Sequence, residues 1–292
     1  MFTSFIQQKK WWLCKMTKKQ RYKYFILMIL MIAATFISTL FLIYSSKINK
    51  SLNTVEGAWL LMIIILMRIS ILSGMAFYMV RQWFNQEAQY LSDIPFLFGM
   101  FFLFLIFGKF LDLLSDLTYY TLVDENEALF ILKVRFFIAI LTLFPMMYLS
   151  IGMILYYLSL KDKYKIYKDE KTRDNTRKII LGIITIIEIL AVILIPDVKT
   201  VGILLPCLVL PSLITIVWLF AFAYRRKRLS QVHPLILAIG FGIYLISNIS
   251  RPLAQAFFGE TPAYAIFSEI VDLLIFLVIF TGLILKVKYN QE

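Results

Sequence analysis

The sequence is poor in charged residues and in the residues that most metal and catalytic sites need. Only 16% of its 292 residues are Asp, Glu, Lys or Arg, whereas a soluble domain usually carries about 25%. It has two cysteines and one histidine. Cys14 lies in a basic stretch and Cys207 in an apolar run, so we expect no disulfide framework and no zinc-type ligand set.

Phosphate-binding and nucleophile motifs are also missing. The sequence has no GxxxxGK[ST] loop and no GxSxG elbow, and His233 stands alone beside Pro234. We therefore expect no cofactor and no metal, and the sequence favours no enzymatic activity. A hard cation held by carboxylates alone remains open.

What the sequence has in abundance is apolar surface. Hydrophobic residues make up 61%, Phe and Tyr number 26 and 16, and the mean hydropathy is +0.80. These values exclude a disordered chain and an ordinary soluble enzyme. They predict an all-α fold, namely a polytopic helical bundle in a membrane. The net charge of +12 is spread over short blocks between apolar runs. This distribution predicts contact with an anionic inner leaflet and no nucleic-acid partner.

Apolar runs long enough to cross a bilayer need about 20 residues. Eight candidates satisfy or approach this length, and we expect them to form one transmembrane domain over residues 24–287. The fifth and seventh are short, and the seventh either continues past Arg251 or breaks at Pro252. The predicted spans cover residues 24–45, 58–80, 94–113, 136–158, 179–195, 201–224, 234–249 and 265–285.

Basic residues in the loops predict the orientation. Loops on one side, together with both terminal segments, hold 22 Lys and Arg residues. The other side holds only Lys47, Lys50, Lys199 and Arg251, apart from Lys133 and Arg135 at the entrance of the fourth span. The positive-inside rule then predicts a plasma-membrane protein with both termini in the cytoplasm and an even number of spans.

The two ends of the chain are expected to differ. Residues 1–23 mix Trp11, Trp12 and Leu13 with Lys and Arg, which is typical of an amphipathic helix lying on the inner leaflet. The apolar stretch from Tyr24 is too long for a cleavable signal, so we expect a retained first helix. Residues 288–292 are expected to form a short cytoplasmic tail.

Charged side chains within or beside the spans carry the functional signal. A charge in a spanning helix costs several kcal/mol unless it is paired or hydrated. Five basic and five acidic residues have such positions, so full pairing is feasible. Arg68 and Glu188 share the middle depth and are expected to pair. The ten are Arg68, Lys109, Lys133, Arg135, Arg251, Asp112, Asp116, Glu188, Glu269 and Asp272.

Most of these charges cluster towards the predicted outer side. Lys109, Asp112 and Asp116 fall on one face of the third span, and Glu269 and Asp272 share a face of the eighth. Together with Arg135 and with the polar groups that end the seventh span, Asn248 and Arg251, they predict an outward-open polar cavity between spans three, four, seven and eight. The alternative is a set of interhelical salt bridges that only fix the packing.

Two functions fit this pattern. The first is a receptor or sensor that binds a small molecule or ion from outside and acts through a separate cytoplasmic protein partner docked on the basic loops 161–178 and 225–228. Pro145, Pro206 and Pro211 would then kink the spans that move. The second is a transporter or permease component, with Arg68 and Glu188 as coupling charges and Asp112 as a cation or proton site. The sequence does not identify the ligand.

Asp112→Asn tests whether Asp112 belongs to a buried polar network. We expect this variant to lower thermal stability, or any ligand response, more than Glu127→Gln, because Glu127 lies in a loop where water replaces a lost partner. Thermal unfolding in detergent measures the difference. Equal and negligible effects of both substitutions would contradict the assignment of Asp112.

Overall fold

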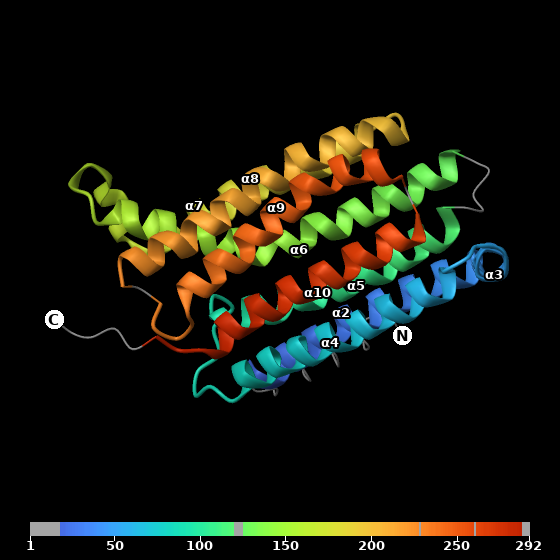
Figure 1. The fold of residues 1–292 in the computed structure, drawn as a ribbon. Helices are drawn as coiled ribbons and strands as arrows, with labels where there is room; N and C mark the ends of the chain where they lie inside the picture. Colours follow the sequence, from blue (N-terminus) through green and yellow to red (C-terminus); the bar gives the residue numbers. More distant parts are fainter. Residues whose placement is uncertain (1–17, 120–124, 228, 260, 288–292) are drawn as a thin grey trace, which may run out of the picture.

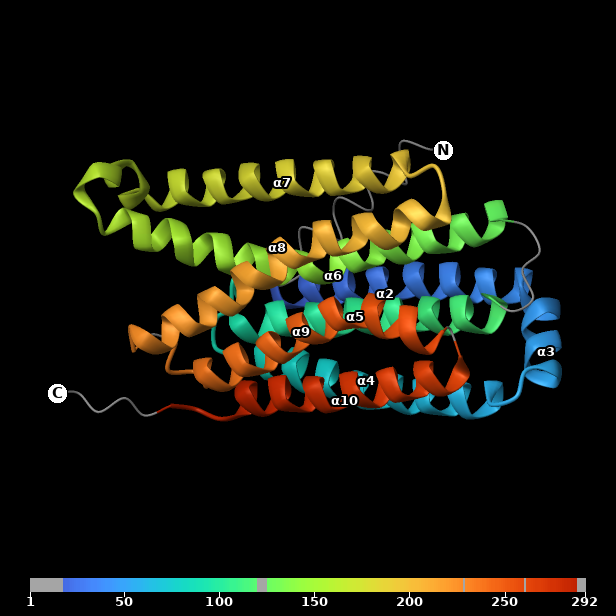
Figure 2. The ribbon, with the colours of Figure 1, turned by 45° about the horizontal axis from the view of Figure 1, so that its top comes forward.

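The computed structural model describes residues 18–119, 125–227, 229–259 and 261–287, and all regular secondary structure in these ranges is helical. Eight long helices lie side by side along one common direction (Figures 1 and 2). They are α2 (Lys18–Ile43), α4 (Ala58–Phe84), α5 (Ile94–Tyr119), α6 (Glu125–Ser159), α7 (Glu170–Leu194), α8 (Val198–Arg225), α9 (Pro234–Phe258) and α10 (Pro262–Ile284). Two short helices, α3 (Ser45–Thr54) and the 3-10 helix η1 (Asp162–Lys168), connect long ones.

Six of the long helices are long and apolar enough to cross a membrane, namely α2, α4, α5, α6, α9 and α10. The chain is therefore a multi-pass helical membrane protein. In α7 the apolar run is interrupted by Arg177, Lys178 and Glu188, and the described apolar part of α8 is Val209–Arg225. Both helices run alongside the others (Figure 2), and eight spans remain a prediction.

The helices extend further than the predicted spans at several ends. The largest difference is in α6, which begins at Glu125 rather than at residue 136. Glu125 and Glu127 in its first turn are favoured by the helix dipole. The predicted seventh span does not break at Pro252, because α9 continues to Phe258. The helix α3 occupies part of the predicted outer loop between the first two spans.

Side-chain caps explain where three helices begin. Asp169 accepts hydrogen bonds from the backbone N–H and the hydroxyl of Thr172 at the start of α7, and these bonds hold the pKa of Asp169 below its usual value. Asp197 caps α8 through Thr200 N–H at 2.8 Å. Thr261 caps α10, whose first residue is a proline that needs no N–H partner.

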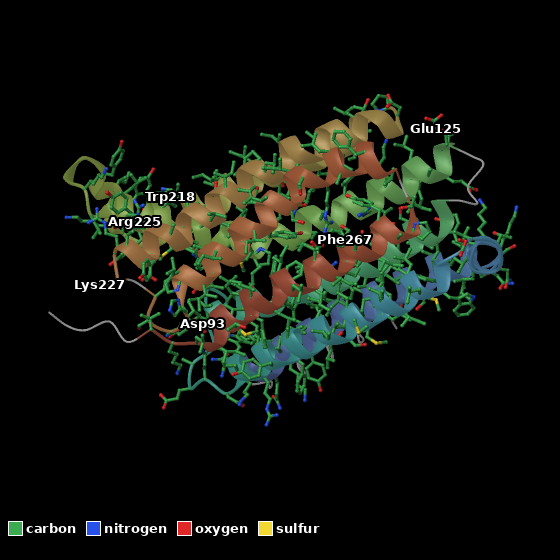
Figure 3. The ribbon with its side chains drawn as sticks, viewed as in Figure 1. Asp93, Glu125, Trp218, Arg225, Lys227 and Phe267 are labelled. Atoms are coloured by element: carbon green, nitrogen blue, oxygen red, sulfur yellow. The ribbon has the colours of Figure 1, made fainter. Side chains whose placement is uncertain are left out.

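The predicted loops gather at two opposite ends of the bundle. One end, the C-terminal end, holds the α4–α5, α6–α7 and α8–α9 connections and the last described residues. The other, the α3 end, holds α3, the α7–α8 turn and the α9–α10 turn. Figure 3 shows Asp93, Arg225 and Lys227 at the first end and Glu125 at the second. The alternation of loops is confirmed. Which end faces the cytoplasm remains a prediction, and residues 1–17 and 288–292 lie outside the described residues.

Six helices close into a ring. In this ring α4 contacts α5, α5 contacts α6, α6 contacts α8, α8 contacts α9, α9 contacts α10, and α10 contacts α4. Outside the ring, α2 packs on α5 and α7 packs on α6. Among the six candidate spans, α5 has by far the largest buried share. It is therefore the ring member most enclosed by other helices.

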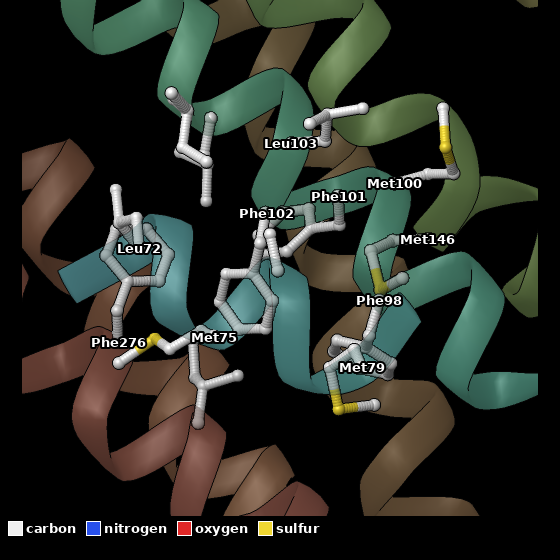
Figure 4. Packing of buried hydrophobic residues seen from close by; sticks show 14 of the residues in the cluster. Leu72, Met75, Met79, Phe98, Met100, Phe101, Phe102, Leu103, Met146 and Phe276 are labelled. Carbon is white, nitrogen blue, oxygen red and sulfur yellow. The ribbon is translucent and has the colours of Figure 1, made fainter. Parts of the chain in front are cut away.

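The ring interior towards the C-terminal end is filled by phenylalanine side chains. Phe98, Phe101 and Phe102 of α5 are fully buried and contact rings from α8, α9 and α10. Figure 4 shows this cluster among Leu and Met side chains of α4 and α5. Phe220 of α8 and Phe241 of α9 stack with their centroids 5.7 Å apart. We call these phenylalanine side chains the phenylalanine block. The block fills the ring interior between its charged residues and the C-terminal end.

Close packing of α9 on α10 requires a glycine at position 240. A Cβ at Gly240 would lie 2.7 Å from Ile279 Cγ1 and 3.3 Å from the Ile279 nitrogen, whereas a Cβ at Gly242 would meet nothing within 4 Å. We expect Gly240→Ala to destabilise the protein by about 1–3 kcal/mol through overpacking. The matched control Gly242→Ala should be neutral or slightly stabilising. Thermal unfolding in detergent compares the two, and equal midpoints would argue against this close contact.

Candidate functional site

The charged residues of the predicted outer cluster, joined by Arg68 from the predicted middle depth, come from five helices of the ring. On α10, Glu269 and Asp272 are three residues apart, and on α5 the same spacing separates Lys109 and Asp112. Residues three apart share a helix face, so each of these two helices presents its two charges on one side, towards the ring interior. The other three cations, Arg68, Arg135 and Arg251, come singly from α4, α6 and α9.

Arg68 occupies the centre of this set. Its side chain is only 1% exposed, and it donates from Nη1 to Glu269 Oε2 at 2.5 Å and from Nη2 to Asp272 Oδ2 at 2.9 Å. The guanidinium also lies over the Phe276 ring, 5.3 Å from its centroid. The α4 cation is thus held between two carboxylates and one aromatic face of α10.

The ion pairs continue from Arg68 in both directions. Glu269 Oε1 accepts from Lys109 Nζ at 2.8 Å, and Lys109 also pairs with Asp112 at 2.5 Å. Beyond them Asp112 pairs with Arg135, and at the opposite end Asp272 pairs with Arg251. We call this arrangement the ion chain. Its order is Arg251, Asp272, Arg68, Glu269, Lys109, Asp112 and Arg135.

Charges alternate along the ion chain and both of its ends are positive. Four cations face three anions, so the chain carries one excess positive charge. The five inner residues are buried. The two terminal side chains are partly exposed, Arg135 by 36% and Arg251 by 27%, although Nε and Nη2 of Arg251 are themselves buried. Burial of the inner charges is tolerable because each has opposite charges on both sides.

Two further polar groups lie near the ends of the ion chain. Asp116 is half-buried one turn beyond Asp112 on α5 and forms no ion pair with another described residue, although the field of Arg135 reaches it. Tyr264 of α10 donates its hydroxyl to the Arg251 carbonyl at 3.0 Å. Asn248 donates to the Tyr244 carbonyl of its own helix at 2.8 Å, a bond that does not connect it to the ion chain.

The predicted pairing of Arg68 with Glu188 is wrong. Arg68 is occupied by Glu269 and Asp272 inside the ring, whereas Glu188 lies half-buried on α7, outside the ring and against α6. Matching depth along the membrane does not establish which helices are neighbours. Among the described residues Glu188 has no ion partner, so it stands apart from the other predicted site residues.

Two contacts of the site were missed by the sequence reasoning. Phe276 follows Asp272 by four residues on α10, so its position on the Arg68 face was available from helical spacing. Lys133 donates to the Ile193 carbonyl at 3.0 Å, near the last turn of α7. Nothing in the sequence signals that contact, because it depends on where α7 packs.

An empty groove lies on another face of α5 and not at the ion chain. It has a volume of about 370 Å³ between α2, α5 and α6, and its lining is apolar, including Phe36, Phe104 and Ile138. The predicted polar cavity between α5, α6, α9 and α10 remains a prediction. Comparison of the chain with protein-family models, with curated proteins and with solved structures finds no match. The functional argument therefore rests on this chain's own residues.

Asp272→Asn should be among the most destabilising single changes in the protein. It leaves Arg68 and Arg251 with less opposing charge in a buried setting, and the loss of one partner of a buried pair costs about 3–5 kcal/mol.

Glu188→Gln is the matched control, because it also neutralises an intramembrane carboxyl but removes no described ion pair. We expect it to leave stability unchanged or slightly raised. Chemical unfolding in detergent micelles measures both variants. A larger loss in Glu188→Gln than in Asp272→Asn would contradict the ion chain.

Proposed function

We propose that the protein is a receptor or sensor of the plasma membrane that binds a small carboxylate-bearing ligand from outside. The observation that carries this proposal is the ion chain, whose only two partly exposed members are the terminal cations Arg135 and Arg251. We take the partial exposure of these two ends as the feature that distinguishes the ion chain from one that serves packing alone.

Orientation makes these cations reachable from outside. The positive-inside rule assigns the basic C-terminal end of the bundle to the cytoplasm. The turn after α9, about two helical turns beyond Arg251, then lies on the outer side, as does the start of α6 about three turns before Arg135. A ligand arriving from outside would meet the two guanidinium groups first.

The chemistry of the two ends favours a carboxylate. Guanidinium groups bind carboxylate oxygens in a planar, bidentate geometry. The positive charge of Arg251 acts on Arg135, and a carboxylate bound at either guanidinium would offset this repulsion. Asp116, which has no described ion partner, adds a carboxyl group one turn beyond Asp112, the partner of Arg135. A guanidinium with a carboxyl group nearby suits a zwitterion, whose ammonium group would face Asp116.

A ligand carboxylate would compete with Asp112 and Asp272 for the terminal cations. When one ion pair weakens, its carboxylate can bind its other cation more strongly. A change at Arg251 would therefore alter the Asp272–Arg68 pair and reach α4 through α10. The buried phenylalanine block fills the ring between the ion chain and the C-terminal end, which favours sensing over transport. Output would pass to a cytoplasmic partner at the basic loops 161–178 and 225–228.

The transporter alternative rests on the same ion chain. Glu188 lies outside the ring, so the coupling charge would have to be Asp112 or Asp116 within it. Transport would also require the phenylalanine block to open during the cycle.

Ligand screening by thermal stabilisation tests the receptor proposal. Purified protein is heated with amino acids, simple carboxylates, sugars and salts, and we expect a saturable rise of the midpoint with one carboxylate class. Arg135→Gln with Arg251→Gln should remove the rise, whereas the exposed control Lys50→Gln at the same end should retain it. Ligand stabilisation follows mass action, so the rise should increase with ligand concentration. An identical rise in the double variant would overturn the proposal.

Charge movement separates the two functions. The protein is reconstituted in liposomes on a solid-supported electrode and pulsed with ions, amino acids, sugars and protons. We expect no sustained current, since the receptor moves no solute across the bilayer. A saturable current that Asp112→Asn abolishes would instead assign the ion chain to a transport path.

A further inference from the structure

A second charged feature lies at the opposite end of the bundle and takes no part in the ion chain. Aromatic rings of α6 and α8 meet there edge to face, with the centroids of Tyr157 and Phe222 5.0 Å apart. Trp218, one turn earlier on α8, stacks on Phe222 at 5.2 Å. The three rings form a continuous apolar slab across the contact between the two helices.

Two cations lie over this slab. Lys161 Nζ is 5.1 Å from the Tyr157 centroid, and the Arg226 guanidinium carbon is 5.8 Å from that of Phe222. Because Tyr157 and Phe222 touch, the two positive groups sit over adjacent rings. We call these five residues the aromatic corner: Tyr157, Lys161, Trp218, Phe222 and Arg226.

The cations of the aromatic corner are free to bind an anion. Lys161 and Arg226 are exposed and form no ion pair with another described residue. The aspartates of the neighbouring α7 start are already engaged, since Asp174 pairs with Arg177 and Lys178 while Asp169 caps the helix. A third cation, Arg173, lies 5.7 Å from the Tyr156 ring and adds to the positive field.

Below the cations the surface becomes apolar and faces lipid. Trp218 is 46% exposed, and Figure 3 shows it deeper along α8 than Arg225 and Lys227. Tryptophan is typical of the boundary between headgroups and hydrocarbon, where its ring packs against lipid chains. The aromatic corner therefore has a positive part, Lys161 after α6 and Arg226 after α8, and an aromatic part that continues to Trp218 one turn earlier on α8. This order matches the charged headgroup and the acyl chain of a phospholipid.

We propose that the aromatic corner binds one anionic phospholipid of the adjacent leaflet. The phosphate lies between Lys161 and Arg226, and the first part of an acyl chain lies along Trp218 and Phe222. Such a lipid would join the ends of α6 and α8, two neighbours in the ring, at the basic end of the bundle. This inference is independent of any ligand bound at the ion chain.

Lipid retention measured by native mass spectrometry tests the proposal. The full chain is released from micelles that contain equal phosphatidylglycerol and phosphatidylcholine. We expect the wild type to retain one phosphatidylglycerol, and the double variant Lys161→Gln with Arg226→Gln to retain it about tenfold less, since each basic residue at a membrane surface strengthens binding to anionic lipid.

Arg225→Gln with Lys227→Gln is the matched control. It removes the same charge from the same end of the bundle but from residues that stack on none of the three rings, so we expect retention close to that of the wild type. An equal loss in both double variants would show a diffuse electrostatic effect and overturn the site. So would retention that neither variant changes.

Quenching of tryptophan fluorescence gives a second test that does not depend on the folding of the double variant. Dibrominated phosphatidylglycerol should quench the wild type more than dibrominated phosphatidylcholine at the same density. Trp11 and Trp12 are first replaced by Phe, because the basic segment that holds them is also expected on the anionic leaflet. In that background the excess should disappear in Trp218→Phe, which keeps an aromatic ring on the slab. No excess in the wild type, or an excess that persists in Trp218→Phe, would refute the proposed lipid position.

Discussion

The structure depends on the cost of placing charge in a medium that cannot solvate it. Arg68 is held in the centre of the bundle with almost no exposed surface, and an unpaired guanidinium there would cost many kcal/mol. The two carboxylates of α10 remove that cost by accepting its hydrogen bonds. Because each carboxylate also serves a second cation, α4, α5, α9 and α10 are tied together at one level.

The need to pair these charges selects one of the many ways in which the helices could pack. Apolar side chains alone pack in many registers, since lipid tails are as apolar as leucine. The ion chain selects one register, because each ion must meet its partner within hydrogen-bond distance. The phenylalanine block then fills the ring on the C-terminal side of the ion chain with rings from α5, α8, α9 and α10. Polar specificity and apolar filling thus occupy separate levels of the same ring.

The two ends of the molecule present different chemistry to their surroundings. Near the α3 end, the terminal cations Arg135 and Arg251 approach the surface beside a carboxylate that has no described ion partner, Asp116. At the C-terminal end, cations lie over half-buried aromatic rings. The first combination suits a small ligand with a carboxylate group, and the second suits the headgroup and chain of a lipid.

By itself, the sequence determined the class of the protein, the approximate places of its long helices and the residues that had to be paired. These follow from local properties, namely the length of apolar runs and the cost of intramembrane charge. Only the tertiary structure decided which charged residues form ion pairs with each other. The sequence places Arg68 and Glu188 at one depth, yet Arg68 meets Glu269 and Asp272, because α4 neighbours α10 while α7 lies outside the ring on α6. Hydropathy records the position of a residue along the membrane normal but not around the bundle, and ion pairing is decided by the second coordinate.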